Sequence, residues 1–190
     1  MLLLADGLKS LLSDSDTTMV VTNTSMVGTL DNIRKDLPAI PDDRFLLIDG
    51  GDMPGYRDYH ALKSMADDAD PQNIEISEDD IYNIMYSSGT TGHPKGIVIS
   101  HKIRVAYATL SASIFRMTPE SIMLHSGALV FNGAFITLLA SMFLGGTFIL
   151  HPQFDTEAFI DTVGREKVTH VMMVPSQVVG VLHSANFSAE

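Results

Sequence analysis

One stretch decides how this 190-residue chain is interpreted: Tyr86-Ser87-Ser88-Gly89-Thr90-Thr91-Gly92-His93-Pro94-Lys95-Gly96. It places four serine and threonine hydroxyls, three glycines and one lysine between two apolar runs. The runs are Ile81–Tyr86 and Gly96–Ile99, and both are predicted to be buried strands. The stretch is therefore a tight loop between two successive strands.

The composition of this loop is typical of a site that binds a polyphosphate. Glycine lets the backbone approach a ligand closely and point successive N–H groups toward it. Ser88, Thr90 and Thr91 add hydroxyl donors, and Lys95 adds a mobile positive charge. An ordinary Gly/Ser/Thr hairpin loop with no ligand is the alternative interpretation.

The Walker A phosphate loop does not fit this stretch. No glycine directly precedes Lys95, and neither serine nor threonine follows it. The residues after the lysine predict a strand, whereas a Walker A loop leads into a helix. The stretch instead resembles, at every fixed position, the phosphate-loop signature of the adenylate-forming superfamily. That superfamily includes acyl- and aryl-CoA synthetases, adenylation domains of peptide synthetases, and beetle luciferases.

The resemblance implies a role for each matched position. The residues that would wrap the β- and γ-phosphates of ATP are Ser87, Ser88, Gly89, Thr90, Thr91 and Gly92, and Lys95 would pair with the same phosphates. It also implies the cosubstrates ATP and CoA, with Mg²⁺ accompanying ATP. The reaction would be ATP-dependent ligation of an acid to a thiol through an acyl-adenylate. No residue of this chain is assigned as a metal ligand or, beyond phosphate binding, as a catalytic group.

Further segments extend the resemblance over roughly the last 110 residues. They are Gly145-Gly146-Thr147, His151-Pro152-Gln153-Phe154-Asp155 and Val174-Pro175-Ser176. They resemble, in that order, a Gly-rich strand entry, a helix-opening Pro-x-Phe-Asp and a Val-Pro-Ser turn of the family. The second segment favours CoA synthetases over peptide-synthetase domains. The first 75 or so residues match only as an α/β unit.

One family motif is absent from this sequence. Members often carry Pro-x-[Phe/Tyr]-His before the helix that lines the acid pocket, and those positions fall here at Gly127 and Leu129-Val130. His125 lies earlier, where a core or strand-end histidine is expected. The resemblance then leaves Phe131, Asn132 and Gly133 as the candidate wall of the acid pocket, with plain packing at a helix start as the alternative.

Apolar periodicity predicts an alternation of strands and helices along the chain. Expected strands are Thr18–Thr22, Arg44–Asp49, Ile81–Ser87, Gly96–Ser100, Ser121–Leu124, Thr147–Leu150 and Val168–Val174. Expected helices are Ala5–Ser13, Met26–Asp36, Tyr59–Ala66, Ile103–Met117, Gly133–Leu144, Asp155–Glu166 and Ser176–His183. This order predicts an α/β fold, a mostly parallel sheet with helices on both faces. By resemblance it is part of the large N-terminal domain of an adenylate-forming enzyme.

Local signals refine this prediction. Ser100 and Asp155 are expected to cap helices, and Pro175 to occupy a first helical turn. The strand Val168–Val174 is almost entirely apolar after His170, which is typical of a strand covered on both faces. The polar residues 67–80 are predicted to form an exposed connector. The chain is therefore predicted to be either one domain over 1–190 or two lobes joined near residue 75.

Charge and cysteine content narrow the function classes. The formal net charge is −11, which argues against a nucleic-acid partner, because such surfaces cluster lysine and arginine. The acidic groups lack calcium-loop spacing and are expected to be solvated. No cysteine is present, so disulfides and thiolate metal sites are excluded. This fits a reducing compartment, and the expected location is the cytoplasm.

The segment from Ser121 to Phe154 contains no charged residue and includes an apolar run long enough to span a bilayer. The favoured interpretation divides it into a buried helix, Phe135–Leu144, a stop at Gly145-Gly146, and a buried strand. No transmembrane segment is therefore expected; a membrane anchor over Gly127–Leu150 is the alternative. No basic residues mark one flank as cytoplasmic, as a membrane helix would require.

Family members usually continue with motifs that bind magnesium and ribose, and with a C-terminal domain that supplies a catalytic lysine. We therefore expect an internal piece of an AMP-forming acyl-CoA synthetase, inactive alone and lacking the C-terminal domain, with fatty acid metabolism as one setting. A non-catalytic nucleotide-binding fragment and an amino-acid adenylation domain are the alternatives. The acid, the thiol acceptor (CoA or a carrier protein) and the oligomeric state stay open.

Overall fold

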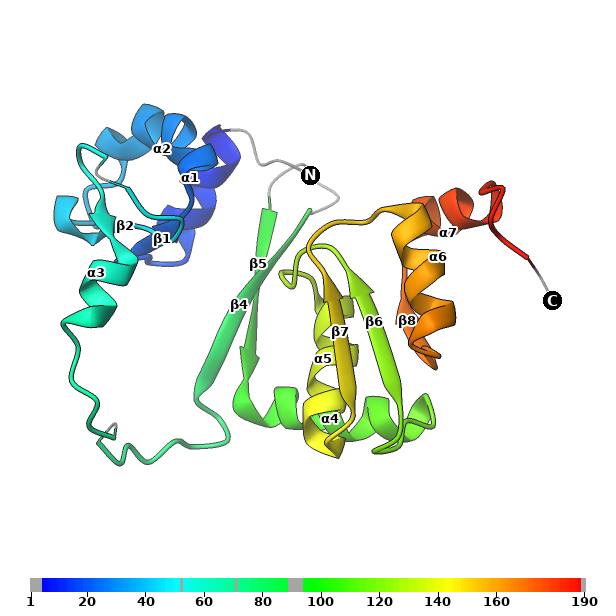
Figure 1. The fold of residues 1–190 in the computed structure, drawn as a ribbon. Helices are drawn as coiled ribbons and strands as arrows, with labels where there is room; N and C mark the ends of the chain where they lie inside the picture. Colours follow the sequence, from blue (N-terminus) through cyan, green and yellow to red (C-terminus); the bar gives the residue numbers. More distant parts are fainter. Residues whose placement is uncertain (1–4, 52, 71, 89–93, 189–190) are drawn as a thin grey trace. The chain divides into compact units, whose positions relative to one another are not determined.

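The computed structural model describes residues 5–51, 53–70, 72–88 and 94–188. Its chain forms two compact units (Figure 1). The first comprises Met1–Ile76 with Tyr86–Ile97, and the second Ser77–Met85 with Val98–Glu190. Each unit is described by itself.

The first unit is a small parallel sheet packed against helices. Its elements are α1 (Ala5–Asp14), β1 (Val20–Thr22), α2 (Val27–Ile33), β2 (Phe45–Leu47), β3 (Arg57–Asp58) and α3 (Tyr59–Ser64). The sheet order is β1-β2-β3, with parallel pairing throughout. Phe45 and Leu47 on the central strand are fully buried with Leu30 and Ile33 of α2. The sequence did not predict β3, because two polar residues carry no apolar alternation.

Two strands flank the glycine-rich stretch, as predicted. They are β4 (Ile81–Ser88) and β5 (Pro94–Ser100), which pair as a two-stranded sheet. The prediction that both strands are buried is wrong for most of their length. Met85 and Ile99 are buried, but Ile81 and Val98 are 62% and 54% exposed. Successive residues of a strand point to opposite faces, and Ile97 is 44% exposed beside Val98, so neither face of this ribbon is covered along its whole length.

The second unit contains the other parallel sheet. Its elements are α4 (His101–Ile114), β6 (Ile122–Ser126), α5 (Asn132–Leu144), β7 (Thr147–His151), α6 (Thr156–Arg165), β8 (His170–Met172) and α7 (Pro175–Leu182). The order is β7-β6-β8, and both pairings are parallel. Met123 and Leu124 of β6 point to opposite faces of the sheet, and neither is exposed. Both faces of the central strand are therefore covered, which confirms the α/β class.

The burial expected for the segment Val168–Val174 is also wrong. The apolar segment Val168–Val174 was expected to be covered on both faces, yet β8 spans only three residues, and Val171 and Met172 are 44% and 37% exposed. The strand pairs with β6 along one side and lies at an edge of the sheet. An apolar run alone does not distinguish a central strand from an edge strand.

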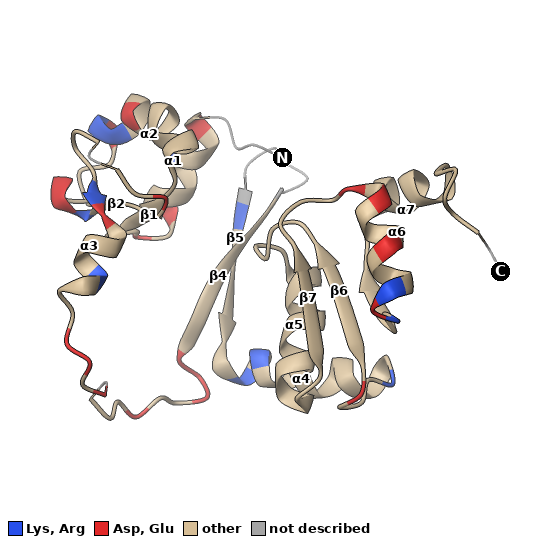
Figure 2. Ribbon diagram, viewed as in Figure 1, with Lys and Arg blue, Asp and Glu red and all other residues tan. Residues whose placement is uncertain are grey.

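The uncharged segment divides into a helix, a glycine stop and a strand, as predicted. The expectation that the strand is buried is wrong, because β7 lies at an edge of its sheet and Leu150 is 44% exposed. Helix α5 ends at Gly145, whose φ of +73° is the left-handed conformation that terminates many helices. Gly146 follows, and a Cβ there would lie 3.0 Å from the carbonyl oxygen of Ser121. In the part of the chain that the structure describes, no helix is long and apolar enough to cross a membrane. In Figure 2 the ribbons of α5, β6 and β7 are tan throughout, the colour of residues other than Lys, Arg, Asp and Glu.

Candidate active site

The hairpin of β4 and β5 brings two parts of the predicted phosphate site together. Ser87 and Ser88 end β4, and Lys95 is the second residue of β5, so all three flank the loop at one end of the ribbon. The side chains of Ser87 and Lys95 are exposed to solvent. Four other predicted phosphate-binding residues, Gly89, Thr90, Thr91 and Gly92, lie outside the described residues.

Tyr86, the first residue of the signature, has a partner that sequence reasoning missed. Its hydroxyl donates to Oδ2 of Asp14 at 2.6 Å, across 72 positions of the chain. Burial, reinforced by the carboxylate of Asp14, raises the pKa of Tyr86 to about 12. The phenol is therefore neutral at physiological pH and anchors the end of β4 to α1. No local pattern in the sequence pairs these two residues.

The opposite end of the hairpin leads directly into α4. Ser100 caps this helix through its side-chain oxygen, which accepts from the N–H of Ile103 at 3.5 Å, as predicted. Lys102 donates to a carboxylate oxygen of Glu78 at 2.7 Å, and both side chains are more than half exposed. Such an exposed ion pair contributes little stability. The acidic segment around Glu78 is thus a solvated connector, as expected.

Arg104 of α4 is a functional candidate that the sequence analysis did not identify. It is 4% exposed, and burial lowers the pKa of its guanidinium from the usual value. The guanidinium lies 4.3 Å from the ring centroid of Phe135 and within 6 Å of the rings of Tyr82 and Tyr107. An arginine at helical spacing resembles any surface cation in sequence, so only the packing reveals its burial.

The candidate acid-pocket residues begin α5. Phe131 is the N-cap residue and is 60% exposed, while Asn132 and Gly133 are partly buried in the first turn. A Cβ on Gly133 would lie 2.5 Å from the terminal methyl of Met172, so a larger residue there would require that flexible side chain to move. The structure brings the three residues together at a helix start; their contact with an acid stays a prediction.

His125 lies on β6, near its carboxyl end, as a buried strand residue. Neither of its ring nitrogens has a hydrogen-bond partner in the described part of the chain. The hydroxyl of the next residue, Ser126, is also buried and unpaired there. Its position agrees with the predicted core or strand-end histidine. It lies toward the carboxyl ends of the parallel strands, where open α/β sheets bind ligands.

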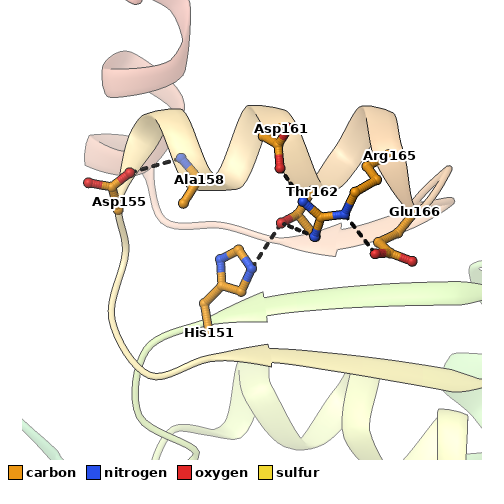
Figure 3. A network of polar contacts seen from close by, with 7 residues as sticks. All are labelled: His151, Asp155, Ala158, Asp161, Thr162, Arg165 and Glu166. Carbon is orange, nitrogen blue, oxygen red and sulfur yellow. Dashed lines mark hydrogen bonds and ion pairs between the residues drawn. The ribbon is translucent and has the colours of Figure 1, made fainter.

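The segment His151–Asp155 organises the entry into α6, as Figure 3 shows. Asp155 caps the helix, and its Oδ1 accepts from the N–H of Ala158 at 2.8 Å, which confirms the predicted cap. His151 at the end of β7 contacts the hydroxyl of Thr162 at 3.2 Å. Arg165 pairs with Asp161 and Glu166 on the exposed side of the helix. The family-like segment is therefore a capping turn, and its polar groups are used in folding.

A metal site requires several histidine or carboxylate ligands close together. Among residues 5–51, 53–70, 72–88 and 94–188, no group of three or more histidine, aspartate or glutamate side chains is arranged to hold a metal ion. The hydroxyl of Ser87 and the ammonium of Lys95 at the hairpin end suit an anion instead, because they offer donors and positive charge. A nucleoside triphosphate matches this chemistry. No magnesium ligand is assigned to this chain.

Comparison with known proteins agrees with this geometry. The chain is 27% identical over 171 residues to the indoleacetate–CoA ligase of Aromatoleum aromaticum, covering 90% of this chain and 33% of that enzyme. It is 34% identical over 117 residues to a feruloyl-CoA synthase of an Amycolatopsis species, covering 58% of this chain and 23% of that enzyme. The chain thus spans a third or less of these relatives.

Solved structures show the same fold. The anthranilate CoA ligase AuaEII, crystallised with anthranoyl-AMP, superposes with a TM-score of 0.82 at 22% identity, covering 98% of this chain and 36% of that protein. The family model for the AMP-binding enzymes matches residues 2–190. The match runs through both units and includes the glycine-rich hairpin described above. The chain belongs to the family of AMP-binding enzymes.

Proposed function

We propose that the polypeptide carrying this chain is an ATP-dependent acid–thiol ligase, an AMP-forming acyl- or aryl-CoA synthetase. The observation that carries the proposal is the hairpin end, where Ser87, Ser88 and Lys95 flank a loop that matches the family signature at every fixed position. Family membership over residues 2–190 supports it. The chemistry of the donors suits a triphosphate.

The proposed reaction has two halves. A substrate carboxylate attacks the α-phosphorus of ATP, and an acyl-adenylate forms as pyrophosphate leaves. A thiol, that of CoA, then attacks the acyl carbon and AMP leaves. Negative charge gathers on the departing pyrophosphate in the first half, and fixed N–H groups, hydroxyls and a lysine stabilise it with little reorganisation. Mg²⁺ bound to the ATP phosphates would neutralise part of the same charge.

We propose an aromatic acid as the substrate class to be tested first. Indoleacetate and ferulate, which the names of the two relatives specify, both carry an aromatic ring. The exposed ring of Phe131 at the start of α5 offers apolar surface for such a ring. A reducing, cytoplasmic location is proposed from the absence of cysteine.

Carboxylate-dependent exchange of labelled pyrophosphate into ATP tests the proposal. The exchange is measured with this chain and with the longest polypeptide that its gene encodes, across aromatic, fatty and amino acids. We expect exchange in the longer protein with an aromatic acid. Exchange with amino acids alone would reassign the protein to the amino-acid-activating branch. Exchange with none of the acids, although ATP binds, would reduce the assignment to nucleotide binding.

A further inference from the structure

Arg104 is buried without an opposite charge. It is the one lysine, arginine, aspartate or glutamate among the buried polar residues that the structure describes, and no carboxylate of those residues pairs with it. Burying a cation away from water is costly unless hydrogen bonds and favourable dipoles replace its hydration. Neutral partners must therefore replace the lost hydration of the guanidinium. These partners also show which side chains Arg104 holds in position.

The guanidinium joins two asparagines on different elements. Its Nε and Nη2 donate to Oδ1 of Asn83 on β4, at 3.1 and 3.0 Å. Its Nη1 donates to Oδ1 of Asn132 on α5, at 3.3 Å. Its Nη2 also lies 2.8 Å from the sulfur of Met85. One side chain on α4 thus connects the strand that enters the phosphate loop with the helix that carries the candidate acid pocket.

These contacts fix which way each amide faces. A guanidinium carries five N–H donors and no acceptor, and it does not lose its proton in proteins. The oxygen of the Asn132 amide must therefore face Arg104, and its NH₂ group must face away. A rotated amide would place N–H against N–H beside a buried positive charge. Hydrogen bonds that involve a charged donor are roughly twice as strong as neutral ones, so the charge of Arg104 favours this orientation.

Asn132 lies where further donors are available. It is the first residue of α5, and Phe131 provides no side-chain cap for this helix. The first backbone N–H groups of a helix lack partners within the helix, and its dipole favours electron-rich groups at that end. The residue is only partly buried.

We infer that Arg104 is a positioning residue that makes Asn132 a hydrogen-bond donor to the acid substrate, at a site where the same amide could otherwise accept. The inference rests on the proposed function. It adds that the acid is held through an acceptor oxygen, its carboxylate or an oxygen on its ring. Asn83 and the rings of Phe135 and Tyr82 hold the guanidinium in place.

The substitution Asn132→Asp tests the inference with an almost unchanged shape. An aspartate pairs with Arg104 even better than asparagine, so the fold is kept, but it presents oxygen where the amide presented NH₂. We expect the KM for the acid in pyrophosphate exchange to rise at least tenfold and the KM for ATP to stay within twofold. The thermal unfolding temperature is expected to be unchanged or higher.

The matched control is Asn83→Asp. It also places a carboxylate against Arg104 and keeps both acceptor contacts, but the residue belongs to β4 and not to the first turn of α5. We expect the KM for the acid to stay within twofold. An equal rise in both variants would mean that the added carboxylate disturbs Arg104 in general, and it would overturn the inference.

Arg104→Met and Arg104→Lys separate positioning from plain packing. The methionine variant frees the amide of Asn132, so the KM for the acid is expected to rise at least tenfold, whereas lysine restores a donor and part of the affinity. A lowered unfolding temperature with an unchanged KM in the methionine variant would show a structural role alone. An unchanged KM in Asn132→Asp, with active wild-type enzyme, overturns the inference but leaves the proposed ligase intact. Wild-type enzyme without exchange would refute both.

Two acids then identify the acceptor. An aromatic acid with a ring oxygen and its methyl-substituted counterpart are compared in wild type and Asn132→Asp. A loss confined to the oxygen-bearing acid assigns the contact to the ring substituent, and an equal loss with both acids assigns it to the carboxylate. Both results support a donor role for Asn132, whereas tighter binding of either acid by the aspartate variant contradicts it.

Discussion

Lys95 carries the positive charge at the end of the hairpin that flanks the predicted phosphate loop. It lies one residue after the start of β5, is exposed, and forms no ion pair with the carboxylates that the structure describes. A mobile ammonium is suited to follow a phosphate group as it departs. Lys102, the next lysine along the chain, differs because its ammonium already pairs with the carboxylate of Glu78.

We predict that Lys95→Ala slows adenylation at least tenfold in the full polypeptide. Removing one fixed donor from such a site commonly costs about 3 kcal/mol of transition-state stabilisation. Pyrophosphate exchange at saturating ATP and acid measures the effect. Lys102→Ala is the control, because it also removes a lysine, and its exchange rate should match that of the wild type. Unchanged kinetics in Lys95→Ala would remove this residue from the phosphate site.

The turn between α5 and β7 shows how an element ends. Gly145 adopts a φ of +73°, and both its N–H and that of Gly146 donate back to the carbonyl of Ser141 in the last turn of the helix. Gly146 then lies close against the backbone of Ser121. The helix therefore stops after 13 residues, and the chain re-enters the sheet beside β6. The same turn explains why an uncharged stretch is not one long helix.

Two glycine-to-alanine substitutions should change the free energy of unfolding in opposite directions. Gly145→Ala places a Cβ in the left-handed region and is expected to cost about 1 kcal/mol. Gly164→Ala in α6 meets no atom within 4 Å and has helical backbone, so it is expected to gain about 0.5–1 kcal/mol. Urea unfolding of both variants beside the parent chain measures the difference. Equal shifts in the same direction would contradict the cap assignment.

Net charge and exposed apolar surface have opposite effects on the self-association of the whole chain. The formal net charge is −11, which keeps copies apart. Large apolar side chains are nevertheless exposed, among them Ile114, Met142 and Phe143 at 70%, 70% and 59%. Apolar surface of this kind favours association when copies can approach each other.

We therefore expect self-association that grows with ionic strength. Raising salt from about 0.01 M to about 1 M shortens the screening length from about 30 Å to about 3 Å, which weakens repulsion but leaves apolar attraction. Sedimentation velocity at both salt concentrations measures the change. The neutral double substitution Met142→Ser and Phe143→Ser should reduce the association without altering charge. A dimer that dissociates with added salt would instead indicate an interface held by charge.

Local patterns in the sequence were sufficient for the class of fold, the family and the two strands that flank the glycine-rich stretch. Strand and helix periodicities, the caps at Ser100 and Asp155, and the glycines after α5 all act within a few residues, so neighbouring letters carry them. Other contacts join residues far apart in the chain. They are the hydrogen bonds of buried Arg104 to Asn83 and Asn132 and the hydrogen bond from Tyr86 to Asp14. Only the tertiary structure decided these contacts, and likewise the exposure of β4 and β8, because burial depends on which distant element packs against a side chain.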